Sequence, residues 1–340
     1  RIIEAQALDN TCSLRARFLN TLRDSLAGLS WRDVMLGLGM GERLAIPQDI
    51  KTLMQQTGTS HLMAISGLHI ALGASLGWLL VRGIQFFLPS RLISWRLPLL
   101  AGWVCAMAYA MLTGMQPPAL RTVVAAGIWY SLRLSGRQWT GWEVWLCCLA
   151  TIVFLDPLAA LSDSLWLSAF AVGTLIFWYQ WVPLPEGYFA RRLRPLASLI
   201  HLQIGLMLLL APLQIWLFHG ISVTSLLANV VAVPVITFIA VPMILLAMFL
   251  HLCAPAVVEM VVWYGADRVL AMVFAYLRLL PAGWLGINGA WLGISLIPWL
   301  AVLLWRLHGW WRYSALWLPL CTLLAFPLWQ KPPADQWQVT

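Results

Sequence analysis

Two serines and two histidines stand at the start of a long apolar run, in the stretch GTSHLMAISGLHIALG of residues 58–73. A serine and a histidine can act as nucleophile and general base when their side chains lie within hydrogen-bond distance. Ser66 and His69 are three residues apart, which suits such a pair poorly, and no acid that would orient the histidine is evident. The sequence AISG also lacks the first glycine of a GxSG-type turn. An intramembrane serine hydrolase is therefore an alternative, and not the preferred interpretation.

A helix through this stretch would place Ser66, His69, Gly73 and Gly77 on one small, polar face. Two glycines four residues apart permit the close approach of a second helix, so tight packing is one explanation of this face. A polar lining for a conduit is the other explanation. His61 precedes the face and is expected near the membrane interface.

The composition indicates that these residues belong to a membrane protein. Of the 340 residues, 61% are hydrophobic and only 10% are charged, whereas about a quarter of the residues of a soluble domain are charged. Many of the 22 tryptophans fall at the ends of apolar runs, where an aromatic belt meets the lipid headgroups. The net charge of +8 is ascribed mainly to arginines in short loops, which record membrane orientation rather than a nucleic-acid ligand. We expect an all-α, polytopic membrane domain.

Apolar runs long enough to cross a bilayer recur along the chain, and some of them are broken or amphipathic. They predict about ten membrane segments, near residues 62–81, 97–113, 119–135, 140–156, 164–182, 199–218, 226–249, 256–280, 289–305 and 313–330. Alternate loops are rich in arginine: Arg82, Arg91, Arg96, Arg133, Arg137, Arg191, Arg192, Arg194, Arg306 and Arg312. The positive-inside rule places these loops in the cytoplasm and both ends of the chain outside.

Residues 1–57 resemble a soluble, amphipathic lead-in. Leu14, Phe18, Leu22 and Leu26 recur every fourth residue and predict a helix with one apolar face. A second helix is expected to start after Ser30 and to be broken by the glycines at 37, 39 and 41, and a third is expected from Pro47 to Gly58. The predicted domains are the lead-in (1–57), a transmembrane domain (58–330) and an exit linker (331–340) towards a further domain.

Polar and helix-breaking residues inside the predicted segments are candidates for function, because such groups are costly in lipid. Arg121 suits either the interface or a pore, and Gln214 and Asn229 suit either interhelical hydrogen bonds or a polar path. Pro234 and Pro242 predict helix breaks, which are tolerated at membrane depth where protein or water covers the backbone.

The predicted segment 256–280 carries Glu259, Asp267 and Arg268. Three charged residues in one run fit an amphipathic, half-inserted or cavity-facing helix better than a simple span.

No cofactor or metal site is expected. The six cysteines show no CxxC or CxxH spacing and no acid–histidine cluster accompanies the histidines, so a zinc site is not indicated. No GxxxxGK[ST] loop for nucleotide phosphates occurs.

The order of several motifs resembles the competence domain of the ComEC family. The run LGMGERLAIPQDIKTLMQQTGTSHLMAISGLHIAL matches its signature, with the Gly41-Glu42-Arg43 turn and the block from Ala64 to His69. Three further segments resemble later parts of the family pattern: PPALRTVVAAG around Arg121, DPLAALSDSLWLSAFAVGTL, and QIGLMLLLAPLQIWLFHGISVTSLLANVVAVPV. The resemblance covers about residues 29–242; beyond it, only hydropathy matches.

The resemblance implies a multi-pass domain of the bacterial inner membrane that passes single-stranded DNA to the cytoplasm and is not itself an enzyme. It also implies flanking DNA-binding and metallo-β-lactamase-like domains in the same polypeptide, a periplasmic DNA receptor, and a cytoplasmic motor or single-strand-binding protein. A small-molecule or ion transporter is the alternative, since broken helices and midplane polar groups serve it as well. The candidates for the DNA path are His61, Ser66, His69, Gly73, Arg121, Gln214 and Asn229.

Overall fold

The computed structural model describes residues 14–63, 65–89, 93–136, 138–184, 193–253, 255–286 and 292–307. Nearly all of this part of the chain is helical, which confirms the all-α prediction. Two short strands, β1 (Gly220–Ser222) and β2 (Trp284–Gly286), pair in a two-stranded sheet.

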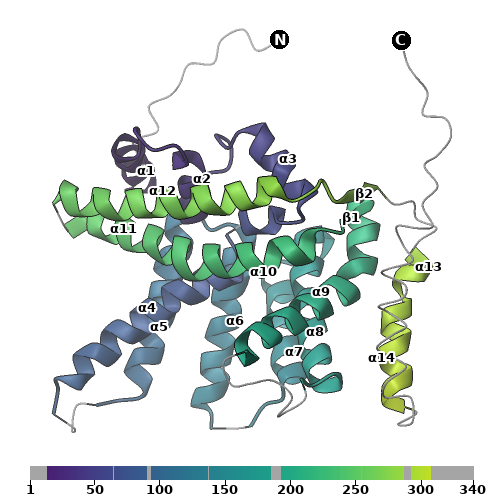
Figure 1. Ribbon diagram of the computed structural model, residues 1–340. Helices are drawn as coiled ribbons and strands as arrows, with labels where there is room; N and C mark the ends of the chain where they lie inside the picture. Colours follow the sequence, from purple (N-terminus) through teal and green to yellow (C-terminus); the bar gives the residue numbers. More distant parts are fainter. Residues whose placement is uncertain are drawn as a thin grey trace, which may run out of the picture. The chain divides into compact units, whose positions relative to one another are not determined.

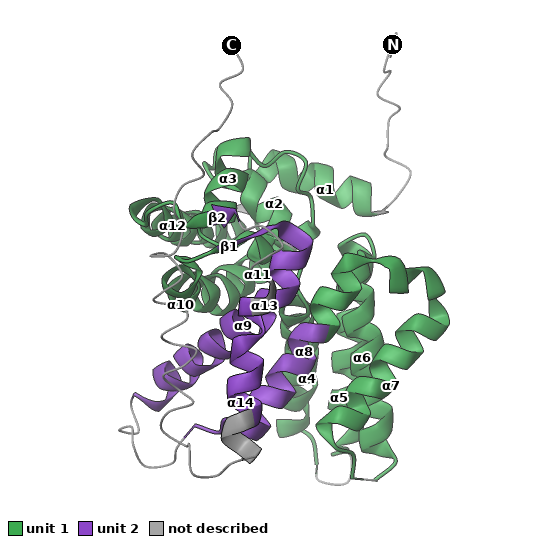
Figure 2. Cartoon of the chain, turned by 90° about the vertical axis from the view of Figure 1, so that its right-hand side faces the viewer, with its two compact units in different colours: residues 1–169, 222–284 green, residues 170–221, 285–340 purple. Residues whose placement is uncertain are grey.

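The chain divides into two compact units (Figure 2). Unit 1 comprises residues 1–169 and 222–284, and unit 2 comprises residues 170–221 and 285–340. The predicted domain boundary after residue 57 stays a prediction, and the one after residue 330 lies outside the described residues.

The amphipathic lead-in forms three helices, as predicted. The apolar face of the first one packs on protein, because Leu22 and Leu26 belong to the main core of unit 1. The prediction that the glycines at 37 and 39 break the second helix is wrong, because the helix continues to Met40 and ends only at Gly41. Both glycines instead give room to neighbouring side chains: a Cβ at Gly39 would lie 2.9 Å from Ile244 Cγ2. The helices are α1 (Leu14–Ser25), α2 (Arg32–Met40) and α3 (Gln48–Gln56), followed by the short turn η1 (Ser60–Met63).

The next four long helices of unit 1 form a bundle in which α4 packs closely on α5, and α6 packs on α4, α5 and α7. Proline at the start of α6 and the capping box of Thr140 and Glu143 at the start of α7 fix where those helices begin. Their bounds are α4 (Gly67–Phe86), α5 (Arg96–Leu112), α6 (Pro117–Leu134) and α7 (Gly141–Leu155).

A long rod and a second long helix complete unit 1 and run across the direction of α6 and α7 (Figure 1). The rod consists of α10 (Ser225–Val235), the π-helical turn η4 (Ile236–Ala240) and α11 (Val241–Cys253). Helix α12 (Ala256–Leu279) packs on the rod and also contacts α2 and α3. Trp263, Phe274 and Leu277 are buried in this contact, so α12 is one of the most deeply embedded helices of the unit.

Three helices among the described residues are long and apolar enough to cross a membrane: Gly67–Phe86, Arg194–Phe218 and Ser225–Cys253. Two shorter apolar helices are Arg96–Leu112 and Gly141–Leu155. The first nine predicted segments all overlap helices, and the tenth, 313–330, lies outside the described residues. The segment at 256–280 is the helix α12, which is not among the three. Its two acidic residues, Glu259 and Asp267, are buried against protein partners, whereas Arg268 is exposed.

Unit 2 contains most of α8 (Asp163–Trp181), whose first turns belong to unit 1 after the turn η3 (Pro157–Leu161). Its other helices are α9 (Arg194–Phe218), α13 (Leu292–Ser295) and α14 (Ile297–Leu307). The ring of Trp299 packs beside Phe170 and Phe177, and its Nε1 donates to Leu209 O at 3.0 Å. These contacts join α8, α9 and α14 within the unit.

Candidate functional site

The small face predicted on the first long helix is packed against α5. A Cβ at Gly73 would lie 3.2 Å from Tyr109 Cδ1, and one at Gly77 only 2.5 Å from Cys105 Sγ. On the facing helix, a Cβ at Gly102 would lie 2.9 Å from Ala74 O. The two backbones therefore approach at positions where only glycine fits, as expected for tight packing of small residues. A role of Gly73 in a path stays a prediction.

Ser66 and His69 do not form a reactive pair in this structure. Ser66 is the residue before α4 and its hydroxyl makes no capping bond, and the two residues are joined by a backbone bond from His69 N to Ser66 O at 3.1 Å. The His69 ring is 1% exposed and its Nδ1 has no partner among the described residues. A buried imidazole without an orienting acid does not provide the geometry of a serine hydrolase.

His61 is exposed in η1, beside a turn that docks on the start of the rod. Gly58, with φ of +69°, approaches Ser225 and Ser222 so closely that a Cβ would lie 2.6 Å from Ser225 Cβ. The Ser222 hydroxyl donates to Gln56 O at 2.7 Å and closes the end of α3.

Arg121 lies in the first turns of α6 and is only 9% exposed. Its Nη1 donates to Ser164 O at 2.6 Å and to Ser168 Oγ at 3.1 Å, and its Nη2 donates to Ser164 Oγ at 2.6 Å. Its Nε donates to Pro117 O at 3.1 Å. The side chain thus joins α6 to the first turns of α8 within unit 1.

The partners of Arg121 are neutral. No carboxylate forms an ion pair with this guanidinium in the described part of the chain, so its positive charge is solvated by hydroxyl and carbonyl oxygens alone. Ser162 Oγ lies 2.8 Å from Ser164 Oγ and extends the group of hydroxyls. Ser164 and Ser168 are exposed, so this arginine–serine cluster (Arg121, Ser162, Ser164 and Ser168) reaches the surface of unit 1.

Asn229 and the two prolines lie along the rod. Asn229 is 9% exposed, and its Oδ1 has no partner among the described residues. The rod continues through Pro234 and Pro242 with the π-helical turn Ile236–Ala240 between them, so the prolines distort the rod and do not end it. A π-turn is a common response to an interrupted hydrogen-bond ladder.

Gln214 lies on α9 in unit 2 and is half-buried. In the same unit, Trp178 Nε1 is placed between His201 Nδ1 and His201 O, at 3.2 and 3.1 Å. A Cβ at Gly205 would lie 2.6 Å from the Trp178 ring. The glycine of the QIG sequence therefore makes room for an indole.

The Gly41-Glu42-Arg43 turn docks on the loop between α5 and α6. Gln116 Nε2 donates to Gly41 O at 3.1 Å, and Arg43 Nη2 donates to Gln116 Oε1 at 2.9 Å. Partial burial lowers the pKa of the Arg43 guanidinium from its usual value. Arg15 adds a second tie, since it donates to Leu112 O at 2.9 Å and to Met40 O. One arginine thereby satisfies the end carbonyls of two helices.

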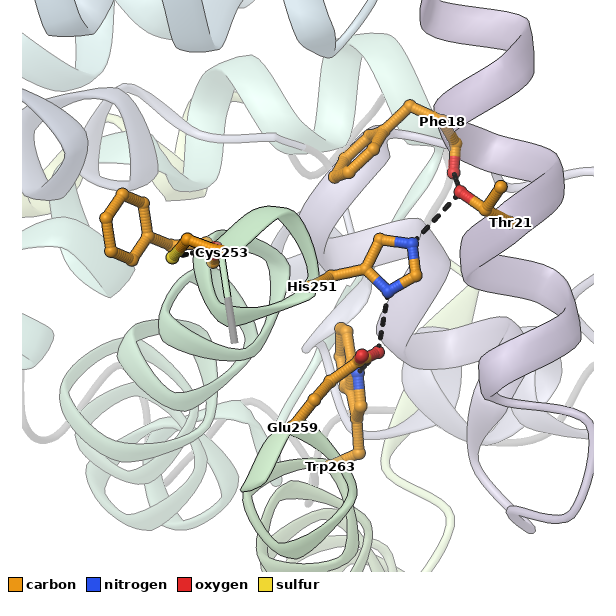
Figure 3. Close-up of polar contacts among 7 residues, drawn as sticks. Phe18, Thr21, His251, Cys253, Glu259 and Trp263 are labelled. Atoms are coloured by element: carbon orange, nitrogen blue, oxygen red, sulfur yellow. Dashed lines mark hydrogen bonds and ion pairs between the residues drawn. The ribbon is translucent and has the colours of Figure 1, made fainter. Parts of the chain in front are cut away.

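The structure also contains a polar cluster between α1, α11 and α12 that the sequence did not predict. Glu259 is 5% exposed, and its Oε1 accepts from Trp263 Nε1 at 2.8 Å and lies 2.9 Å from His251 Nδ1. The other ring nitrogen of His251 lies 3.0 Å from Thr21 Oγ1 (Figure 3). The spacing of Glu259 and Trp263 by four residues could have suggested their contact on a helix. The contact with Thr21, 230 residues from His251, had no sequence signal.

The described residues hold no group of three His, Cys, Asp or Glu side chains that could bind a metal ion.

Comparison with known proteins agrees with the family resemblance. The profile of the Competence protein family matches residues 38–312. The chain is 53% identical to Uncharacterized protein YcaI of Escherichia coli over 100% of this chain and 45% of that protein. It is 35% identical to Recombination protein 2 of Haemophilus influenzae over 84% of this chain and 36% of that protein. It is 32% identical to Competence protein ComA of Neisseria gonorrhoeae over 63% of this chain and 30% of that protein.

The chain spans less than half the length of each of these relatives. No solved structure matches it. Because the family profile extends from the lead-in helices to the last described helix and beyond, the chain belongs to the competence protein family.

Proposed function

We propose that this domain is a membrane conduit that passes single-stranded DNA into the cytoplasm during DNA uptake. Membership of the competence family and the three apolar helices long enough to span a bilayer support this proposal. The domain acts without chemistry of its own, in the inner membrane, with the arginine-rich loops in the cytoplasm and both ends of the chain in the periplasm.

The arginine–serine cluster carries the proposal. A DNA strand has one negative charge per nucleotide and cannot cross hydrocarbon, so its path needs polar groups and positive potential that do not hold it tightly. The Arg121 guanidinium is nine-tenths buried, and its bonds within the described part of the chain go to neutral oxygens. No carboxylate among those residues forms an ion pair with it, so its positive field is not neutralised by direct pairing there. The neighbouring hydroxyls of Ser164 and Ser168 are exposed and offer weak, exchangeable contacts.

The proposed translocation of DNA also requires partners on both sides of the membrane. The lipid bilayer surrounds the domain, a periplasmic receptor delivers the strand, and a cytoplasmic motor or single-strand-binding protein pulls it inwards. Flanking DNA-binding and metallo-β-lactamase-like domains of the same polypeptide would receive and process DNA outside. His61, Ser66, His69, Gln214 and Asn229 remain candidates for further contacts along the path.

Uptake of fluorescent DNA tests the role of Arg121. Full-length protein carrying Arg121→Gln is produced in cells that lack the native copy, and cytoplasmic arrival of the label is scored. We expect Arg121→Gln cells to lose most of the fluorescent DNA signal in the cytoplasm while the protein level stays normal. Arg121→Lys should restore the signal in part, because lysine keeps the positive charge but lacks the planar set of donors. Arg268→Gln is the matched control, because this arginine is exposed and its hydrogen bonds among the described residues go to Tyr264 on its own helix. Normal uptake in Arg121→Gln cells would refute the proposal for this cluster.

Cysteine accessibility tests the exposure of the path. Ser164→Cys and Ser168→Cys are introduced after the six native cysteines have been replaced. A membrane-impermeant thiol reagent should label both positions, and added single-stranded DNA should slow the labelling. Leu165→Cys, at a position between the two serines that is 1% exposed, should stay unlabelled. Labelling of Ser164→Cys that DNA does not affect would exclude this surface from the path.

A small-molecule or ion transporter is the second candidate function. The buried, unpartnered Oδ1 of Asn229 beside the π-helical break favours it, because transporters bind substrates at discontinuous helices. Asn229→Leu would then abolish solute uptake into proteoliposomes and leave DNA uptake by cells unchanged.

A further inference from the structure

A groove of about 310 Å³ lies between α4, α5 and α6, inside unit 1. Its walls are mainly apolar, with alanines at positions 74, 106 and 126 forming the floor and the rings of Trp78 and Trp129 standing higher. Trp78 and Trp129 are 39% and 41% exposed, so the groove opens to the surroundings. Helix α4 has the length and composition of a membrane span, and a groove on the side of such a helix would open to lipid.

Three arginines follow the groove at one end. Arg82 comes four residues after Trp78 on α4, Arg133 comes four residues after Trp129 on α6, and Arg96 comes three residues before Leu99 on α5. Trp78, Leu99 and Trp129 all line the groove. At a rise of 1.5 Å per residue, each arginine begins about 4.5 to 6 Å beyond the groove along its helix. The end of α4, the start of α5 and the end of α6 all point downward in Figure 1, so the three arginines follow the groove in the same direction along their helices.

These arginines are exposed, and none of them forms an ion pair with an acidic side chain in the part of the chain that the structure describes. The guanidinium of Arg133 lies over the Trp129 ring at 5.1 Å, and that of Arg96 lies over the Trp95 ring at 5.5 Å. Arg82 lies 3.5 Å from Gln85 Oε1. The sequence contains no Asp or Glu between Asp49 and Glu143.

Glu143, the next carboxylate along the chain, is engaged at the start of α7. It accepts from the backbone N of Thr140 at 2.7 Å and from its hydroxyl at 3.0 Å. The three guanidinium groups are therefore available to an external anion.

We propose that this groove binds one anionic phospholipid. An acyl chain lies between Trp78 and Trp129 over the alanine floor, and the headgroup phosphate meets Arg82, Arg96 and Arg133. An apolar trough that ends in several cations complements a diacyl anionic lipid, because basic pockets between membrane helices select such headgroups. Single-stranded DNA fits the groove poorly, since a polyanion gains nothing from its apolar walls. The inference requires only that α4 lies in the membrane, and not that DNA passes.

Native mass spectrometry of the full-length protein in detergent measures this binding. The protein is titrated with phosphatidylglycerol and, separately, with phosphatidylcholine of the same acyl chains. We expect one tight site for phosphatidylglycerol and weaker binding of phosphatidylcholine. Each arginine near an anionic headgroup contributes about a five-fold change in affinity, so the preference should be at least about ten-fold.

Two variants separate the parts of the site. Arg96→Gln combined with Arg133→Gln should remove most of the preference and leave phosphatidylcholine binding unchanged, and Arg268→Gln on α12 is the matched control. Ala126→Leu should fill the groove and weaken the binding of both lipids. Ala275→Leu, at an exposed position of α12, should leave the binding of both lipids unchanged. Unchanged thermal midpoints exclude unfolding as the cause.

A photoactivatable phosphatidylglycerol locates the lipid. With the reactive group on its acyl chain, it should crosslink to peptides of α4, α5 or α6 in the wild type and not in Ala126→Leu. The proposal is overturned if both lipids bind equally, if the double variant keeps the preference, or if the crosslinks fall elsewhere. Displacement of bound phosphatidylglycerol by an oligonucleotide at equal concentration would also overturn it, in favour of a DNA phosphate at these arginines.

Discussion

The indole ring of Trp31 lies flat on the ring of Phe274, with centroids 4.4 Å apart and planes 9° apart. This contact joins the start of α2 to α12, and the backbone N of Trp31 donates to Asp267 Oδ1 at 2.8 Å beside it. Trp31 is the N-cap residue of α2, so the carboxylate of Asp267 pairs one of the backbone donors that the start of the helix leaves without an intrahelical acceptor. The lead-in helices are thus attached to α12.

Trp31→Ala should loosen this attachment. Removal of a large aromatic side chain from a core contact costs about 3 kcal/mol, so we expect a lower thermal midpoint and faster proteolysis of α1 and α2. Trp31→Phe should retain the stacking on Phe274 and lower the thermal midpoint less than Trp31→Ala does. Trp216→Ala is the control, since that ring is 65% exposed; an equal effect of both alanine variants would contradict the assignment.

Glu259→Ala should destabilise the protein more than Glu259→Gln does. The alanine leaves Trp263 Nε1 buried without an acceptor, which costs about 2 kcal/mol, whereas glutamine keeps an oxygen there. Thermal unfolding in detergent compares the two variants. Asp24→Ala is the reference, because the carboxylate of Asp24 is exposed on α1. Identical midpoints for Ala and Gln at position 259 would show that the indole bond contributes little.

Two glycines of α4 should respond oppositely to alanine. Gly77→Ala forces a Cβ against Cys105 Sγ and Ala101 O, at 2.5 and 2.8 Å, and should separate α4 from α5 and lower the thermal midpoint. At Gly83 no described atom lies within 4 Å of an added Cβ. Gly83→Ala should therefore stabilise the helix by up to about 1 kcal/mol. A neutral Gly77→Ala would mean that the two helices are not packed as described.

Gly41→Ala should disrupt the docking of the lead-in. Its φ of +77° is unfavourable for a side chain by about 1–2 kcal/mol, and a Cβ would lie 2.6 Å from Gln116 Nε2. Hydrogen exchange should rise at residues 41–46 and at the loop between α5 and α6. Gly28→Ala is the control, because the described structure leaves open space around a Cβ at that position. It should leave hydrogen exchange unchanged in both of these regions.

Most helix bounds could be predicted because the chain marks them chemically. Gly, Pro and Arg interrupt the apolar runs, so α5, α6 and α7 begin and end within two residues of the predicted ranges. The family membership could also be predicted, because several short motifs follow one another along the chain in the order of the family pattern.

The role of a helix was harder to predict than its existence. Hydropathy reports that α12 and the rod are apolar, but not whether lipid or protein covers them. In the rod, 44% of the most apolar window is buried inside the protein, and Ile244 and Met248 pack on Gly39 of the lead-in. Such contacts join residues about 200 positions apart, and periodicity within one helix carries no information about them.

The candidate site was predicted in part. Arg121 was identified because a cation in an apolar run is costly, and its serine partners lie in a segment that resembles the family pattern. His251 and Thr21 were not identified, because each is an ordinary interface residue until the fold brings them together.

The π-helical turn Ile236–Ala240 fixes the angular setting of everything that follows it in the rod. Each residue of an α-helix advances the azimuth by about 100°, so removing one residue from this turn would rotate Ile244 and Met248 away from Gly39. The side chains that meet α2 are therefore selected by the number of residues in a single turn. A deletion or an insertion there would turn the rod's exposed stripe inward without altering one amino acid of α11.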